Sequence, residues 1–232
     1  MKRYKHLFFD LDRTLWDFES NSGATLEHLF REFALQRLGI HEFEVFRQRY
    51  EYHNERFWER FRKGYMRRDD LRWKRMWHTL LDFKVADAGF ALQLSKVYLE
   101  LLPQQGRLMP HAKEVLEYCR KKDYKLHLIT NGFENTQWQK MRTSGIDHYF
   151  DQVITSEGSN SMKPKPGIFA YAVQAAGATA QTSVMIGDSL EADIQGARLY
   201  GMDQIYFNPG RTQHKYNCTY EIDCLSKLKT LL

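Results

Sequence analysis

The stretch that decides the fold runs His6-Leu7-Phe8-Phe9-Asp10-Leu11-Asp12-Arg13-Thr14. Its apolar first half is typical of a buried strand in a parallel sheet, and acidic residues follow where that strand should end. Side chains two residues apart in an extended segment point the same way, so Asp10 and Asp12 can face one site. Ligands of open α/β sheets bind beyond the carboxyl ends of the strands, and this pair would lie there.

Short β-rich runs alternate with helical stretches at the start of the chain and again after about residue 104. This alternation predicts an α/β fold, a Rossmann-like parallel sheet core with helices on both faces. The expected strands are residues 6–10, 125–130, 152–156, 183–188 and 204–207, and helices are expected to begin at Pro110, Glu134, Pro166 and Leu190.

Residues 18–102 break this alternation because they hold no convincing strand. Apolar and aromatic residues recur there three or four positions apart, as at Leu26, Leu29 and Phe30, which predicts about four amphipathic helices. No Pro-rich or Gly/Ser-rich linker sets the segment apart. We therefore expect a discontinuous core, residues 1–16 and 104–232, with an inserted all-helical cap over residues 17–103.

The composition is that of a globular protein, with 43% hydrophobic and 27% charged residues among 232, which excludes wholly disordered and collagen-like chains. Asp10 interrupts the first apolar run, so we expect no signal peptide, no membrane partner and a cytoplasmic location. Three cysteines without a C-x-x-C spacing argue against a disulfide framework or a thiolate zinc site. The net charge of +5 suits anionic partners such as phosphates but selects none.

The paired acids call for a positive charge between them. Two carboxylates about 4 Å apart repel by roughly 4 kcal/mol at an effective dielectric near 20. A hard divalent cation such as Mg²⁺, which takes oxygen ligands, would relieve this, and a further acid should then stand at another strand end. Asp188 does so, following Gly187 at the tip of an apolar run. Asp193 lies early in the next helix, where acids are common regardless of chemistry, so both a site role and a local role stay open for it.

Two further segments could hold a phosphate. Lys163 stands beside prolines that fix the backbone just before a helix, which could hold one ammonium in place; the alternative is an ordinary solvated loop lysine. Thr130, Asn131 and Gly132 end a buried strand ahead of a helix, where a hydroxyl and exposed N–H groups make an anion cradle. Asn131 could also cap that helix, which is compatible with the cradle.

Taken in this order, the four motifs resemble the signature of the haloacid dehalogenase-like hydrolase superfamily, subfamily I, with a helical cap. The resemblance implies Mg²⁺-dependent hydrolysis of small-molecule phosphomonoesters through an aspartyl-phosphate. It implies Asp10 as the nucleophile, Asp12 as the acid/base, and Asp193 as support for the metal ligands. The implied phosphate-binding residues are Thr130, Asn131 and Lys163, and the implied metal ligands are Asp10, Asp12 through its backbone carbonyl, and Asp188.

The second acid separates reaction types within this superfamily. Its dehalogenases lack an acid at the Asp12 position, so a phosphatase or a phosphomutase is favoured here. The segments 12–18, 129–133 and 187–194 look like those of bacterial house-cleaning pyrimidine 5'-nucleotidases, which implies pyrimidine nucleoside 5'-monophosphates as substrates. A sugar-phosphate phosphatase and a phosphomutase are the alternatives. Arg13 stands where many members carry Gly, and Gly158 where relatives often carry an acid.

Residues 56–75 contain nine Arg or Lys and three acids, with the aromatic residues Trp58, Phe61, Tyr65 and Trp73 among them. One interpretation is an electropositive lid that steers phosphate esters and stacks a base. Another, which we favour, is an ordinary pair of amphipathic helices whose aromatic residues face the cap core. A nucleic-acid-binding module is the alternative from another functional class, although nucleic acid is not the expected partner. The oligomeric state is left open.

Overall fold

The computed structural model describes residues 4–232, which form two compact units. The cap unit is Glu19–Gln105, and the core unit is Gly106–Leu232 together with the N-terminal segment through Phe18. Each unit is described here by itself. In the part of the chain that the structure describes, no helix is both long and apolar enough to cross a bilayer.

The core unit is built on one six-stranded sheet in the order β3-β2-β1-β4-β5-β6, and every neighbouring pair is parallel. This confirms the predicted α/β class. The strands are β1 (His6–Phe9), β2 (Lys125–Thr130), β3 (Gln152–Thr155), β4 (Ser183–Gly187), β5 (Asp203–Phe207) and β6 (Tyr220–Ile222). The sequence did not predict β6, because three residues at a sheet edge with one buried side chain, Ile222, carry too little periodicity.

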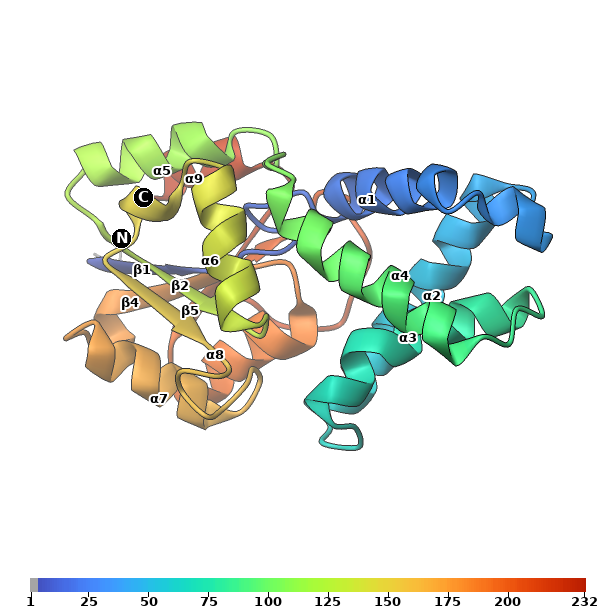
Figure 1. Cartoon of the computed structure of the whole chain (residues 1–232). Helices are drawn as coiled ribbons and strands as arrows, with labels where there is room; N and C mark the ends of the chain where they lie inside the picture. Colours follow the sequence, from blue (N-terminus) through green and yellow to red (C-terminus); the bar gives the residue numbers. More distant parts are fainter. Residues whose placement is uncertain (1–3) are drawn as a thin grey trace. The chain divides into compact units, whose positions relative to one another are not determined.

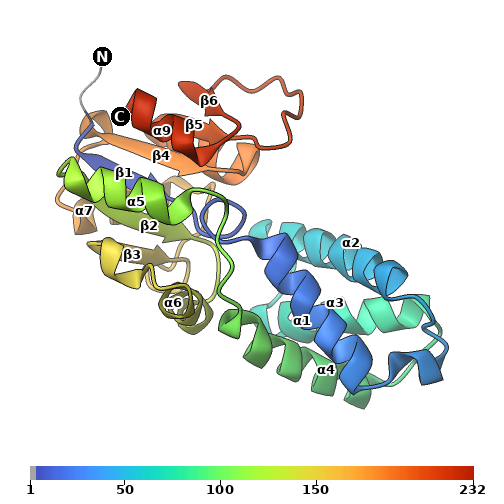
Figure 2. The ribbon, with the colours of Figure 1, turned by 90° about the horizontal axis from the view of Figure 1, so that it is seen from above.

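Helices cover both faces of this sheet, as predicted. In Figures 1 and 2, α5 and α9 lie on one face and α7 on the other. Phe8 and Met185 from the strands pack with Ile168 and Phe169 of α7 in one buried apolar cluster. The core helices are α5 (Ala112–Lys121), α6 (Glu134–Thr143), α7 (Pro166–Ala175), α8 (Gly196–Tyr200) and α9 (Leu228–Leu231).

The prediction of one regular helix from Leu190 was wrong in detail. Residues Leu190–Gln195 form a π-helical segment, η5, and α8 begins only at Gly196. The N–H of Ile194 donates to the carbonyl of Ser189, five residues earlier, at 3.2 Å. In this wider turn Asp193 points back toward the end of β4. Short π-helical segments of this kind occur frequently at functional sites.

The cap unit consists of helices, and residues 19–105 contain no strand. Its buried positions include Leu26, Leu29 and Phe30, the apolar residues whose spacing predicted the first helix. Of the aromatic residues in the basic stretch, Trp58 and Phe61 are partly buried, whereas Tyr65 is exposed. The helices are α1 (Phe18–Glu32), α2 (Phe43–Arg62), α3 (Arg68–Asp82) and α4 (Ala88–Leu101).

Short 3-10 turns complete the secondary structure of both units. They are η1 (Leu35–Leu38), η2 (Leu102–Gln104), η3 (Asp147–Tyr149), η4 (Ala180–Thr182) and η6 (Leu225–Lys227).

The chain leaves and re-enters the core unit at two segments that are hydrogen-bonded to each other. The N–H of Met109 donates to the carbonyl of Leu15 at 2.9 Å, and the N–H of Asp17 donates to the carbonyl of Arg107 at 3.1 Å. An ion pair between the side chains of Asp17 and Arg107, at 3.4 Å, joins the same segments. The residues on either side of the inserted cap unit are therefore fixed beside one another within the core unit.

Candidate active site

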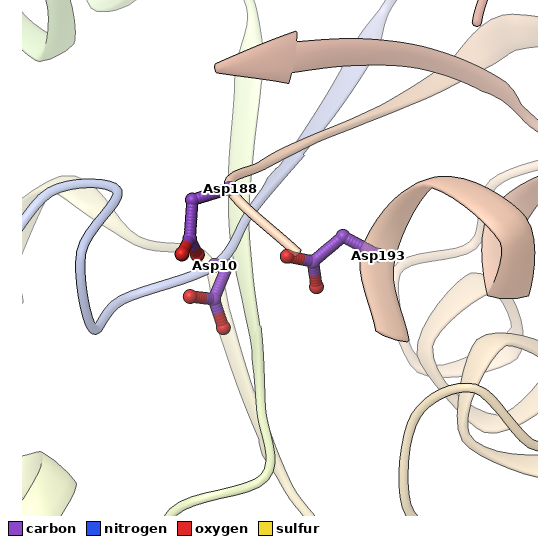
Figure 3. Close-up of side chains that lie close together, drawn as sticks. All are labelled: Asp10, Asp188 and Asp193. Carbon is purple, nitrogen blue, oxygen red and sulfur yellow. The ribbon is translucent and has the colours of Figure 1, made fainter. Parts of the chain in front are cut away.

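Three carboxylates meet at the carboxyl end of the central strands. Asp10 follows β1, Asp188 follows β4, and Asp193 lies in η5 (Figure 3). One oxygen of each lies within 4.8 Å of the others. The parallel register explains the meeting, because Phe9 is level with Ile186 and the next residues leave adjacent strands together. We call Asp10, Asp188 and Asp193 the acid cluster.

The acid cluster strongly disfavours its own negative charge. Burial raises the pKa of Asp10 to about 7, Asp193 adds to this, and the nearby Lys163 opposes it. Burial, followed by repulsion from Asp10 and Asp193, raises the pKa of Asp188 well above its ordinary value. The cluster therefore carries its full negative charge only when further positive charge is bound beside it.

Lys163 supplies part of that positive charge. Its ammonium donates to Asp10 Oδ1 at 2.5 Å, to Asp193 Oδ1 at 2.6 Å and to the carbonyl of Ile129 at 2.7 Å. The side chain is 2% exposed, so the alternative of a solvated loop lysine is wrong. Although burial opposes its charge, Asp10 and Asp193 raise the pKa of this ammonium above the ordinary value. Lys163 is thus a fixed cation, and its contact with phosphate remains a prediction.

Asp193 forms one hydrogen bond within the site and one local bond, and its support of the metal ligands remains a prediction. Its Oδ1 accepts from Lys163, and its Oδ2 accepts from the N–H of Ser189 at 3.0 Å, a local bond at the start of η5. The absence of a side chain at Gly187 makes this position available, because a Cβ there would overlap the Asp193 carboxylate. Both oxygens of Asp193 are therefore engaged by the protein.

Asn131 holds the backbone of Lys163. Its side-chain N–H donates to the Lys163 carbonyl at 2.9 Å, and its side-chain oxygen accepts from the Lys163 N–H at 2.8 Å. The alternative that Asn131 caps the following helix is wrong, since its side-chain oxygen accepts from Lys163 and the residue that caps α6 is Phe133. Its predicted contact with phosphate remains a prediction, and the contact the structure contains is with Lys163.

The Thr130 hydroxyl lies at the end of β2 and is buried. Its oxygen accepts from the N–H of Gly132 at 3.1 Å and from the side chain of Gln137 at 2.6 Å. Because both bonds use the oxygen as an acceptor, the hydroxyl proton stays available as a donor. This is the property that the predicted phosphate contact of Thr130 requires.

The Asp12 carboxylate lies apart from the acid cluster. Oδ1 accepts from the Lys140 ammonium at 2.5 Å, and Oδ2 accepts from Gln137 at 3.1 Å. Sequence reasoning did not identify either donor, since both belong to a helix about 125 residues away and nothing in their spacing marks them. Metal binding through the Asp12 backbone carbonyl remains a prediction.

Arg13 stands where many members of the superfamily that the sequence resembles carry Gly. Its backbone adopts a left-handed conformation with φ of 68°. Such a φ is easiest for glycine, which accounts for that preference. The Arg13 guanidinium lies 4.9 Å from the centroid of the Phe18 ring. It also lowers the pKa of Asp188, although burial and the neighbouring acids raise that pKa by more.

The chain is similar to known proteins of one family. A family model described as haloacid dehalogenase-like hydrolase matches residues 4–201. The chain is 32% identical to pyrimidine 5'-nucleotidase PynA of Streptococcus pneumoniae, over 97% of this chain and 96% of the relative. It is also 32% identical to a glyceraldehyde 3-phosphate phosphatase of Pyrococcus abyssi, over 89% of this chain and 82% of the relative.

Among solved structures, the fold is similar to that of the HAD-hydrolase YfnB of Bacillus subtilis, crystallised with magnesium bound. The TM-score is 0.89 and the identity 29%, and the match covers 99% of both chains. The fold is therefore similar, along nearly the whole chain, to that of a protein crystallised with magnesium.

Proposed function

This chain belongs to the haloacid dehalogenase-like hydrolase family and is a phosphatase, and from that premise we propose that it hydrolyses nucleoside 5'-monophosphates, preferring pyrimidines, with Mg²⁺ as cofactor. The observation that carries the proposal is the acid cluster with the buried ammonium of Lys163 beside it. An anionic nucleophile can approach an anionic ester only where fixed positive charge offsets the repulsion.

The donor set fits Mg²⁺. The acid cluster offers carboxylate oxygens, the ligands that a hard divalent cation prefers, and the raised pKa values of Asp10 and Asp188 mark a place where positive charge is wanted. Lys163 bonds Oδ1 of Asp10, and Asp193 has both oxygens engaged, which leaves Asp10 Oδ2 and Asp188 as the proposed ligands together with the Asp12 carbonyl. The bound ion would screen the charge between the carboxylate and the phosphate ester.

The proposed reaction has two steps. A carboxylate oxygen of Asp10 attacks phosphorus, the bond from phosphorus to the ester oxygen breaks, and the proton of the Asp12 carboxylic acid passes to the leaving alkoxide. Water then attacks the aspartyl-phosphate while Asp12 takes its proton. The bond from phosphorus to Asp10 breaks, so inorganic phosphate leaves and both acids return to their starting forms.

Residues around the acid cluster have supporting roles in this proposal. Lys163 holds Asp10 at a fixed position and would bind a phosphate oxygen as Asp10 is esterified, because its acceptor there loses charge. The Thr130 hydroxyl has a free proton to donate to another phosphate oxygen. Asn131 supports the Lys163 contact indirectly by holding the backbone of Lys163.

The similarity to PynA supports a pyrimidine nucleotide as substrate. The similarity to a glyceraldehyde 3-phosphate phosphatase favours a second candidate, a phosphatase of small sugar phosphates with the same chemistry. The two candidates differ only in the leaving alcohol, so the test compares alcohols.

The test is a panel of phosphomonoesters in Mg²⁺: UMP, dUMP and CMP, the purines AMP and GMP, and glyceraldehyde 3-phosphate with glucose 6-phosphate. We expect kcat/KM to be highest for the pyrimidine nucleotides, and activity to be lost with EDTA and in Asp10→Asn. The circular dichroism spectrum of that variant controls for folding. Preferential hydrolysis of the sugar phosphates would overturn the nucleotide assignment, and no phosphate release from any ester would overturn the reaction.

A further inference from the structure

Asp12 is held by two side chains that come from a single helix. Gln137 and Lys140 lie one helical turn apart on α6, so their side chains project from the same face. Each donates to a different oxygen of the Asp12 carboxylate, at 3.1 Å and 2.5 Å. Both donors are almost completely buried, whereas the Asp12 side chain is 28% exposed. The carboxylate is thus fixed from behind and accessible from the solvent side.

The ammonium of Lys140 has few other partners. It lies 4.2 Å from the centroid of the Trp16 ring and 5.7 Å from that of Phe18, so aromatic faces surround it. Among residues 4–232, Asp12 is the only carboxylate within ion-pair distance of it. A buried cation depends strongly on such a partner, so this pair constrains the position of Asp12 more than an exposed ion pair would.

Gln137 connects two strand ends. The same side-chain nitrogen donates to Asp12, which follows β1, and to Thr130, which ends β2. The Gln137 side chain occupies the space that a Cβ at Gly132 would need. The glycine after Asn131 therefore provides room for this bridge.

We propose that Lys140, supported by Gln137, is a positioning residue that keeps the Asp12 carboxyl turned away from the acid cluster and toward the leaving oxygen of the substrate. This inference rests on the proposed function, in which Asp12 transfers the proton. Without its two donors the Asp12 side chain would occupy several rotamers, and fewer of them would place it for proton transfer.

The leaving group reveals whether proton donation is impaired. The 5'-alkoxide of a nucleotide is a poor leaving group and needs the proton, whereas p-nitrophenolate leaves readily without one. The ratio kcat/KM reports only the steps through release of the alcohol, so slower hydrolysis of the aspartyl-phosphate does not affect it. A fall in kcat/KM that is confined to alkyl esters is therefore a sign of a misplaced acid. If Lys140 had a purely structural role, its loss would lower kcat/KM equally for alkyl esters and for p-nitrophenyl phosphate.

The experiment measures kcat/KM of Lys140→Met for the best alkyl substrate of the panel and for p-nitrophenyl phosphate. Methionine keeps the stem against Trp16 and removes the donor. We expect a loss on the order of 10²-fold for the alkyl ester and little change for p-nitrophenyl phosphate, as general acids contribute about 10² to 10⁴. Lys140→Arg, which restores charge and donors, should recover much of the loss.

Two further variants complete the set. Gln137→Leu, which removes one donor without exposing a new charge, should show the same split to a smaller extent and covers the case in which Lys140→Met folds poorly. Arg142→Met is the matched control, because Arg142 is an exposed cation of the same helix that lies over Trp138. It should leave both ratios unchanged.

The outcomes separate this inference from the proposed function. If the wild-type protein hydrolyses both esters and the variants lose both equally, the positioning role is overturned while the phosphatase assignment stands. If the wild-type protein hydrolyses neither ester, the proposed function fails and this inference fails with it. A selective loss on the alkyl ester, with recovery in Lys140→Arg, supports the positioning role.

Discussion

Asn131 and Lys163 are 32 residues apart, yet the side chain of the first forms hydrogen bonds with both the N–H and the carbonyl of the second. The Asn131 amide thereby pairs with the backbone groups of Lys163 as a neighbouring strand would in a sheet. The Lys163 ammonium reaches the acid cluster from this fixed backbone. The placement of the buried cation thus depends on one polar side chain at the end of β2.

Asn131→Ala should therefore affect both stability and turnover. Two hydrogen bonds are lost and two backbone groups are left unpaired, which should lower the free energy of unfolding by about 1 to 3 kcal/mol. A lower kcat is expected as the Lys163 ammonium shifts. Urea denaturation and steady-state kinetics measure these effects. The matched control is Asn135→Ala, which removes an exposed amide on α6. Equal stability of the two variants would show that the Asn131 hydrogen bonds to Lys163 do not stabilise the fold.

Gly187→Ala should disturb the acid cluster without altering any charged residue. The new Cβ would overlap the Asp193 carboxylate, which must then leave Lys163 or the N–H of Ser189. We expect the free energy of unfolding to fall by roughly 1 to 3 kcal/mol because of overpacking, and kcat to fall strongly. Gly210→Ala, where the added Cβ meets only an ordinary contact with Thr212, serves as the control. Wild-type activity in Gly187→Ala would show that Asp193 can move freely.

Asp188→Asn should separate stability from activity. Burial and the neighbouring acids disfavour charge at this position, so the metal-free variant should be more stable than the wild-type protein by about 1 kcal/mol or more near pH 8. Added Mg²⁺ should then stabilise the wild-type protein but not the variant, because ligand binding to the folded state raises the unfolding free energy. Urea titrations in EDTA and in Mg²⁺ measure both effects. An equal response to Mg²⁺ would remove Asp188 from the proposed ligands.

The burial of His127 should make the free energy of unfolding depend on pH, independently of the active site. It lies buried in β2 with its Nε2 3.0 Å from His6 Nδ1, and its own Nδ1 has no hydrogen-bond partner among the described residues. Burial, followed by the neighbouring His6, lowers the pKa of His127 to about 4. Between that value and the ordinary 6.5, the unfolded chain binds more protons at this residue than the folded protein does.

The contribution of His127 to the unfolding free energy should therefore rise with pH across this window, by at most about 1.4 kcal/mol per pH unit, and level off above pH 6.5. Denaturation of wild-type protein and His127→Leu from pH 4.5 to 7.5 measures it as the difference between the two curves. Taking the difference between the two curves removes the titration of groups that do not interact with His127. Parallel curves would show that His127 titrates alike in the folded and unfolded states.

The fold could be predicted largely from local signals. Apolar runs such as residues 125–130 end in polar residues or glycine, and the structure places strands there. Phe18–Glu32 and the three following helices carry the periodicity that predicted them. The details that were missed depend on tertiary context: β6 is stabilised as a sheet edge, and η5 widens where Asp193 turns back to Ser189.

The candidate site was predictable only in part. Asp10 and Asp188 follow strands that parallel topology brings together, so their proximity could be inferred from the sequence. The hydrogen bonds around them could not. Lys140 reads as one more cation on a polar helix, and only the packing of α6 brings it to Asp12.

The paired segments at Leu15–Met109 and Asp17–Arg107 have a consequence for how this protein could change over time. Because the two crossing points are already joined, a short turn could replace the whole of residues 19–105 without opening the sheet. The cap unit can thus be exchanged as a block, while the acid cluster and Lys163 stay where they are. One core unit could in this way carry different inserts without any change to the residues at the ends of its central strands.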